Sequence, residues 1–113
     1  MSDYSPKILI IDMLDAISAI LAFSGGLSYE DYLRDRKTRD ALYRNIMVLG
    51  EAVHRLPHQF ILAHPEIEWK KIESTRNALV HGYDKIDDRI VWNIIQNILP
   101  GLKVQLENLK AQL

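Results

Sequence analysis

The amino-acid sequence predicts an all-α protein, an antiparallel four-helix bundle with one or two additional short helices. Apolar residues recur at alternating four- and three-residue steps from Leu42 to Leu56, which is the pattern of one buried helix face. No segment shows the two-residue alternation of a half-buried strand. The length of 113 residues suits one domain, residues 1–113, around one core.

The first two helices are defined by their boundary residues. Pro6 suits the first turn of a helix that Ser5 caps, and apolar residues continue to Phe23 before the sequence "SGG" ends the helix. Ser28 and Asp31 have the spacing of a capping box, which predicts a short second helix.

Prolines divide the middle of the chain. A long helix is predicted over residues 38–56, because Pro57 prevents its continuation. Residues 58–64 are expected to form a short turn of helix. The segment 66–81 predicts a further main helix, which ends near Gly82.

The last helix is predicted to start after Asp87, which serves as its cap. Pro100 lies within this helix and predicts a kink. The apolar stripe of the helix comprises Val91, Ile95, Ile98, Leu102, Leu106, Leu109 and Leu113.

Composition excludes several classes of function. With 14 Lys and Arg residues against 15 Asp and Glu residues, the net charge of -1 provides no global field for a polyanion, so nucleic-acid binding requires a local patch. The absence of cysteine excludes disulfides, thiol catalysis and thiolate metal sites, and the expected location is the cytoplasm. The most apolar stretch carries Asp12 and Asp15, so neither a signal peptide nor a membrane anchor is expected. For these two aspartates, ion pairing or a cavity-facing position is favoured over cation binding.

The stretch "RNALVHGYDKID", residues 76–87, differs from the plain amphipathic helices around it. On a helical wheel, Arg76 falls in the middle of the apolar side, where its charge must meet a carboxylate, reach water or face a cleft. Glu51, in the apolar run "VLGEAV", is the natural partner within one chain. Asn77 and His81 fall on another side, so they meet Arg76 only through the end of the helix or through a second copy of the chain.

Each of these residues also has a purely structural interpretation. Arg76 is then half of an ion pair, and His81 is a helix-end residue favoured by the helix dipole. Asn77 either positions phosphate or orients His81, or it forms capping or surface hydrogen bonds. Tyr83 either packs on the bundle or exposes its hydroxyl beside Gly82.

The segments "LGEAVHRL", "HPEIEWKKIESTRNALVHGY" and "IVWNIIQNILPGLKVQL" resemble the HEPN superfamily, and specifically its HepT-like branch, over nearly the whole chain. The superfamily motif is an arginine followed, after a short spacer, by a histidine, which Arg76 and His81 match; the branch adds a tyrosine, matched by Tyr83. The resemblance implies a metal-independent ribonuclease toxin that acts as a homodimer, with both motifs facing one cleft. It also implies a partner, a minimal nucleotidyltransferase antitoxin that transfers AMP to the tyrosine and silences the toxin.

The residue types suit this chemistry on physical grounds. Cleaving RNA without a metal requires a proton acceptor for the 2'-hydroxyl, a proton donor for the leaving 5'-oxygen and positive charge for the phosphorus centre. His81 can serve as acceptor or donor, and Arg76 supplies a permanently charged, bidentate contact. No cofactor or metal ion is expected in this scheme, and an adenylate on Tyr83 would repel RNA.

A basic segment, residues 34–44, provides a second candidate for RNA contact. Five basic residues against two aspartates give it a local charge of +3, so Arg39 and Lys37 are candidates for positioning the RNA backbone. A solvated helix face is favoured on general grounds. The histidines between residues 54 and 64 lack the spacing of a known metal site.

Two functions from different classes remain open. The first is an endoribonuclease toxin that uses Arg76 and His81. The second is a non-catalytic helical subunit that docks a minimal nucleotidyltransferase or presents a ligand to it. A two-fold homodimer is also expected, because the first and last helices carry more apolar positions than one bundle face can bury.

Overall fold

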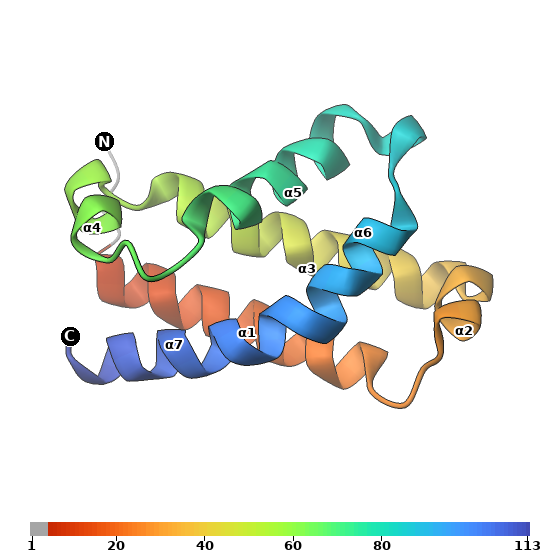
Figure 1. Ribbon diagram of the computed structural model, residues 1–113, viewed down its shortest axis with the longest axis horizontal. Helices are drawn as coiled ribbons and strands as arrows, with labels where there is room; N and C mark the ends of the chain where they lie inside the picture. The colour runs from red at the N-terminus through yellow and green to blue at the C-terminus, as the bar shows by residue number, and fades with distance from the viewer. Residues whose placement is uncertain (1–4) are drawn as a thin grey trace.

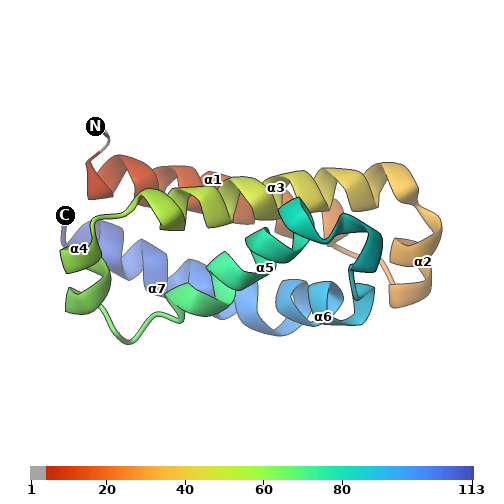
Figure 2. The same cartoon turned by 90° about the horizontal axis from the view of Figure 1, so that it is seen from above.

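The computed structural model describes residues 5–113, apart from the side chain of Tyr83, and these residues form a helical bundle of 40 × 28 × 22 Å (Figure 1). The helices are α1 (Pro6–Ser24), α2 (Tyr29–Arg34), α3 (Arg36–Arg55), α4 (His58–Ala63), α5 (Trp69–His81), α6 (Asp88–Asn93) and α7 (Leu99–Ala111), with a 3-10 turn η1 at Tyr83–Lys85 and a π-turn η2 at Ile94–Ile98. No β-strand is present between residues 5 and 113, so the predicted all-α class is confirmed. In Figure 2, α3 lies between α1 and α5, and α7 lies along α1.

The first two helices have the caps that the sequence predicts. The Oγ atom of Ser5 accepts the backbone N–H of Ile8 at 3.3 Å. Ser28 and Asp31 each accept the backbone N–H of the other, at 3.1 and 3.2 Å, and so form the predicted capping box. Between the two helices the chain turns at Gly26, whose φ of 79° is a left-handed conformation that glycine adopts without steric strain.

The boundaries of α3 and α5 differ from prediction. α3 begins two residues earlier, at Arg36, because Oδ1 of Asp35 accepts the backbone N–H of Thr38 at 3.0 Å and caps the helix there. α5 begins later, at Trp69. The indole N–H of this residue donates to the carbonyl oxygen of His64 at 2.9 Å and closes the turn that precedes the helix.

The predicted irregularity at Pro100 takes the form of the π-turn η2. The backbone N–H of Leu99 donates to the carbonyl oxygen of Ile94, five residues earlier, instead of four. Pro100 has no N–H to donate, and its ring would press on the carbonyl group of Gln96 in a regular helix, so the wider turn accommodates it. The chain bends between α6 and α7 at this point (Figure 1).

One continuous hydrophobic core joins the long helices. The predicted face of α3 and the residue after it is buried throughout, at Leu42, Ile46, Leu49, Val53 and Leu56. Most of the predicted stripe on the last helices is buried as well. Leu113 is 45% exposed, because α7 ends at Ala111 and leaves it beyond the last helical turn. None of the helices within residues 5–113 is long and apolar enough to span a membrane.

A shared carboxylate joins α2, α3 and α6. The hydroxyl of the buried Tyr32 donates to Oδ1 of Asp88 at 2.7 Å, and the hydroxyl of Tyr43 donates to the same oxygen. The ring of Trp92 lies 5.0 Å from the ring of Tyr32, between centroids. Burial and the hydrogen bond to Asp88 raise the pKa of Tyr43 to about 12, and burial also raises the pKa of Tyr32. This contact fixes the start of α6, just after η1.

Candidate functional site

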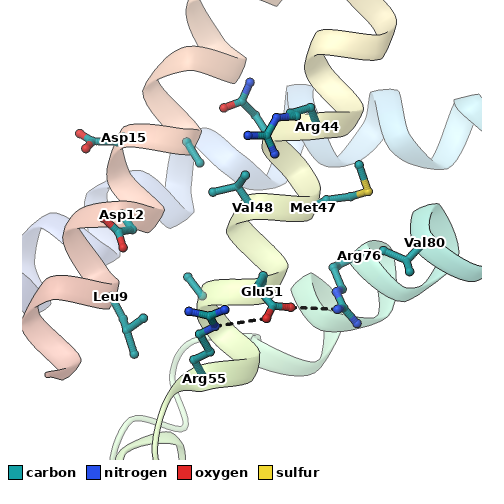
Figure 3. Close-up of a pocket in the computed structure, with 13 residues that line it drawn as sticks. Leu9, Asp12, Asp15, Arg44, Met47, Val48, Glu51, Arg55, Arg76 and Val80 are labelled. Atoms are coloured by element: carbon teal, nitrogen blue, oxygen red, sulfur yellow. Dashed lines mark hydrogen bonds and ion pairs between the residues drawn. The ribbon is translucent and has the colours of Figure 1, made fainter. Parts of the chain in front are cut away.

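Arg76 lines a groove of about 590 Å³ between α1, α3 and α5 (Figure 3). The side chain is 22% exposed, so its charge lies at the groove wall in partial contact with water. The groove is lined by Leu9, Asp12, Asp15, Ala16, Arg44, Asn45, Met47, Val48, Glu51, Ala52, Arg55, Arg76 and Val80. The apolar side of α5 therefore carries its arginine at an opening of the bundle, next to a carboxylate.

Glu51 on α3 binds two arginines (Figure 3). Nη2 of Arg76 lies 2.8 Å from Oε2 of Glu51, and Nε of Arg55 lies 3.2 Å from Oε1. The hydrogen bond from Arg55, supported by the charge of Arg76, lowers the pKa of the Glu51 carboxyl despite the opposing effect of burial. The predicted pairing of Glu51 with Arg76 is confirmed.

Asn77 orients the same arginine. Nη1 of Arg76 donates to Oδ1 of Asn77 at 2.8 Å. The guanidinium is thus held from two sides, by a carboxylate and by an amide oxygen. The contact with Asn77 is a surface hydrogen bond, which is one of the alternatives that the sequence leaves open for Asn77. A role of Asn77 in positioning phosphate stays a prediction.

His81 is the last residue of α5 and is exposed. Its ring forms no hydrogen bond with any residue that the structure describes. Gly82 then ends the helix, and its N–H donates to the carbonyl oxygen of Ala78 at 2.9 Å. Because α5 is regular over this span, Arg76 and His81 lie about 140° apart around its axis. The two motif residues therefore face different directions within one chain.

Gly50 sets the distance between α3 and α5. A Cβ atom at this position would lie 2.1 Å from Cβ of Arg76 and 2.6 Å from its Cγ, which is closer than atoms approach. The close approach places Glu51, the next residue, beside Arg76. Sequence reasoning overlooked Gly50, although a glycine inside a long helix is itself a signal of close packing.

Comparison with known proteins decides the family. The model of the family described as ribonuclease HepT-like matches residues 13–109, which include Glu51, Arg76 and His81. This chain belongs to the HepT-like ribonuclease family. A protein of Thermococcus cleftensis named "Probable ribonuclease HepT" is 35% identical over 106 residues, 94% of this chain and 96% of the relative. A Methanocaldococcus jannaschii protein named as a candidate RNase is 32% identical over 103 residues, 91% of this chain and 85% of the relative. No match to a solved structure was found.

Membership of the HepT-like family confirms the resemblance that the sequence suggested. These relatives are named as ribonucleases, so RNA cleavage is the activity associated with the family. The family match also spans the groove wall on α3 and the motif helix α5. The arginine and histidine of the motif are thus the first candidates for a chemical role.

Two acidic residues belong to the α1 side of the groove of this HepT-like chain. Asp12 and Asp15 lie on α1 and line the groove opposite α3 (Figure 3). This is the cavity-facing position that the sequence favours for them. Within the described part of the chain, no group of three or more histidine, aspartate and glutamate side chains is arranged to hold a metal ion.

The two basic residues singled out on the segment 34–44 differ in their surroundings. Arg39 is half-buried, and its Nη1 donates to the carbonyl oxygens of Tyr32 and Leu33 at the end of α2. This guanidinium helps to terminate α2. Lys37 is exposed near the start of α3. A contact of either residue with RNA stays a prediction.

Tyr83 is the first residue of η1, immediately after the glycine that ends α5. Its side chain lies outside the part of the chain that the structure describes, so the predicted exposure of the hydroxyl is not tested. The two residues that follow it, Asp84 and Lys85, are exposed. The backbone of η1 is fixed at its start, where the N–H of Lys85 donates to the carbonyl oxygen of Gly82 at 2.8 Å.

Proposed function

We propose that this chain is the ribonuclease toxin of a toxin–antitoxin pair and cleaves RNA without a metal ion through Arg76 and His81. The observation that carries the proposal is the placement of Arg76 at the wall of an open groove, oriented by Glu51 and Asn77, in a member of a ribonuclease family. His81, exposed at the end of the same helix, supplies an imidazole that can accept or donate a proton.

The proposed reaction needs only the atoms of RNA and two protein side chains. The 2'-oxygen attacks the adjacent phosphorus while an imidazole accepts the proton of the 2'-hydroxyl. The bond to the 5'-oxygen breaks, and a protonated imidazole donates to that oxygen, which leaves a 2',3'-cyclic phosphate. The guanidinium of Arg76 binds the phosphate oxygens and stabilises the extra negative charge of the transition state.

A homodimer completes the proposed site. One regular helix directs Arg76 and His81 about 140° apart, so convergence on one phosphate requires a second chain. Each of the two sites in the dimer then combines Arg76 of one chain with His81 of the other, and the same imidazole accepts the proton of the 2'-hydroxyl and donates a proton to the leaving 5'-oxygen. Exposed apolar side chains on the first and last helices, at Ile8, Phe23 and Val104, support association.

The central experiment compares RNA cleavage by wild-type protein, His81→Ala and His58→Ala. His58 is exposed on α4 and serves as the matched control. We expect His81→Ala to lose at least about 100-fold in cleavage rate, the usual contribution of general acid–base catalysis, with His58→Ala unchanged. Cleavage should persist in EDTA. Equal inactivity of all three proteins on several RNA classes would favour a non-catalytic docking subunit, and loss of cleavage in EDTA would reject the metal-free mechanism.

The regulatory part of the proposal concerns Tyr83. A partner nucleotidyltransferase transfers AMP from ATP to its hydroxyl, which loses its proton as the bond between the α- and β-phosphates breaks and pyrophosphate leaves. The added phosphate repels RNA near Arg76. Incubation with ATP and the proposed partner nucleotidyltransferase should add one AMP to the wild-type peptide and none to Tyr83→Phe. The Tyr83→Phe variant should stay toxic in the presence of the partner. If the partner neutralises it as well as wild type, inhibition proceeds by binding alone.

A further inference from the structure

A second groove, of about 570 Å³, lies on the other side of the motif helix. α5 and α6 leave the connecting turn in different directions (Figure 1), and the groove lies between them. The exposed Ile90 and Ala78 form its apolar floor together with buried residues such as Leu79. Its volume is in the range of sites that hold one small organic group.

The rim of this groove is basic. Lys70, Lys71 and Lys85 line it, and the sole acidic residue among its described lining residues is Asp87. Nζ of Lys71 is paired with the carboxylate of Glu68 at 3.0 Å, so Lys70 and Lys85 against Asp87 leave a local balance of +1. Oδ1 of Asp87 accepts the backbone N–H of Arg89 and so points its charge at the start of α6. An apolar floor with a cationic rim is complementary to a flat apolar group that carries phosphate.

The groove adjoins the exposed face of α5 that carries the motif histidine. Lys70, Ser74, Asn77 and His81 follow one another at four- and three-residue steps, so they share this face. Lys70 and Ser74 also line the second groove. An extended polymer bound across α5 at His81 can therefore reach the groove while it stays in contact with the surface of the helix.

We propose that this groove is an RNA subsite, which holds a nucleotide adjacent to the scissile phosphate in a single-stranded substrate. The base lies on the apolar floor at Ile90, and the phosphates lie against Lys70 and Lys85. The inference rests on the proposed ribonuclease function. RNA suits the groove better than a protein helix does, because its rim has an excess of lysines over acidic residues.

RNA binding by charge variants tests the subsite. The probe is a fluorescein-labelled single-stranded RNA of about a dozen nucleotides, a length that covers a typical single-strand site. All proteins carry His81→Ala, so that the probe stays intact. Lys70→Gln/Lys85→Gln should weaken binding roughly tenfold at moderate salt and reduce the slope of log K against log salt by about 1.4. The control Lys110→Gln, exposed on α7, should have no effect.

The variant Ile90→Ser tests the floor separately. It should weaken binding through lost base contact, without a change in the salt slope. If the lysine variants bind RNA as tightly as the control, or if no variant binds the probe at all, the subsite does not exist. A change in sedimentation or in partner binding by Ile90→Ser, with RNA binding intact, would make the groove a protein interface and overturn the proposal.

The two proposals fail separately. If wild type cleaves RNA and the lysine variants have the same KM as wild type, the subsite is rejected and the ribonuclease function stands. If the probe binds through the groove but wild type cleaves no RNA substrate, the subsite stands and the ribonuclease function is rejected.

Discussion

At the scale of single residues, Glu51 controls the position of the charge that we assign to phosphate binding. Its two oxygens bind Arg55 and Arg76 separately, so the Arg76 guanidinium is oriented before RNA arrives. A bound phosphate then needs no rearrangement of the arginine, which is the advantage of a preorganised site. Because Glu51 and its two partners are partly exposed, the contribution of the pair to stability is modest.

The variant Glu51→Gln should lower the free energy of unfolding by about 1 kcal/mol or less at pH 7. The pKa of Glu51 is lower in the folded state than in the unfolded state. The ionised Glu51 therefore stabilises the folded protein fully above the unfolded pKa of about 4.3, and this stabilisation is lost as the pH falls through the folded-state pKa. Urea denaturation at pH 7 and pH 3 measures the free energy of unfolding of the variant and of wild type at each pH. The difference between the variant and wild type should become smaller at the lower pH.

Glu107→Gln is the matched control for this experiment. Glu107 is exposed on α7 and forms no ion pair with any residue between 5 and 113. The control should unfold like wild type at both pH values. A difference between Glu51→Gln and wild type that persists unchanged at pH 3 would show that packing, and not charge, holds Glu51 in place.

The residue-scale contacts differ in how far sequence predicts them. Glu51 and Arg76 both fall on apolar helix faces, and a buried charge needs an opposite charge, so their pairing follows from the pattern. The contact of Arg76 with Asn77 does not follow from the pattern, because consecutive residues on a helix point in different directions. Arg76 still reaches Asn77, because its guanidinium lies at the end of a long side chain. The use of Arg39 at the end of α2 depends on how α2 folds back, which no local pattern shows.

At the scale of elements, the crossing of α3 and α5 determines whether the groove residues meet. Gly50→Ala should destabilise the protein by about 1–3 kcal/mol, because the new methyl overlaps the stem of Arg76 and forces α5 outward. Displacing α5 should also reduce RNA cleavage. Thermal unfolding and cleavage assays measure the two effects.

Gly101→Ala provides the control for this substitution. Gly101 is also inside a helix, but no atom lies within 4 Å of the Cβ position. The added methyl should therefore stabilise the protein by up to about 1 kcal/mol, since alanine favours the helix. Opposite signs for the two glycines are expected. Stabilisation by Gly50→Ala would mean that α3 and α5 separate freely.

The contact of two tyrosines with Asp88 fixes the element that follows the motif. Asp88→Ala leaves the buried hydroxyl of Tyr32 and the half-buried hydroxyl of Tyr43 without their acceptor. A loss of about 2–3 kcal/mol in the free energy of unfolding is expected, because these hydrogen bonds end on a charged group. Denaturant unfolding measures it. Asp84→Ala, in the exposed turn η1, should change stability by less than about 0.5 kcal/mol.

Element boundaries follow from sequence where one residue type determines them. The capping box at Ser28 and the stop at Gly26 are local, and both occur as predicted. Pro100 predicts an irregular helix but not its form, because a kink and a π-turn both relieve the same clash. The start of α5 depends on the bond between Trp69 and His64, which the helical pattern does not contain.

At the scale of the whole molecule, the site that we propose takes residues from two chains, because Arg76 and His81 face different directions within one chain. Residues 5–113 bury one core, and the apolar patterns predict that core well. The same patterns do not predict which surfaces of two chains would contact each other in a dimer, because single exposed apolar residues occur both at interfaces and on solvated surfaces. The assembly is therefore best tested through the chemistry that it would complete.

Mixing two inactive variants tests whether each site takes Arg76 from one chain and His81 from the other. Arg76→Ala and His81→Ala should each be inactive alone. After subunits exchange at equal amounts, half of the dimers are mixed, and each mixed dimer has one of its two sites intact, so about one quarter of wild-type activity should return. If both residues of a site come from the same chain, no mixture contains an intact site, and activity should stay at the level of the single variants. Sedimentation must show a dimer in both preparations; a 13.1 kDa monomer at micromolar concentration would contradict the shared site directly.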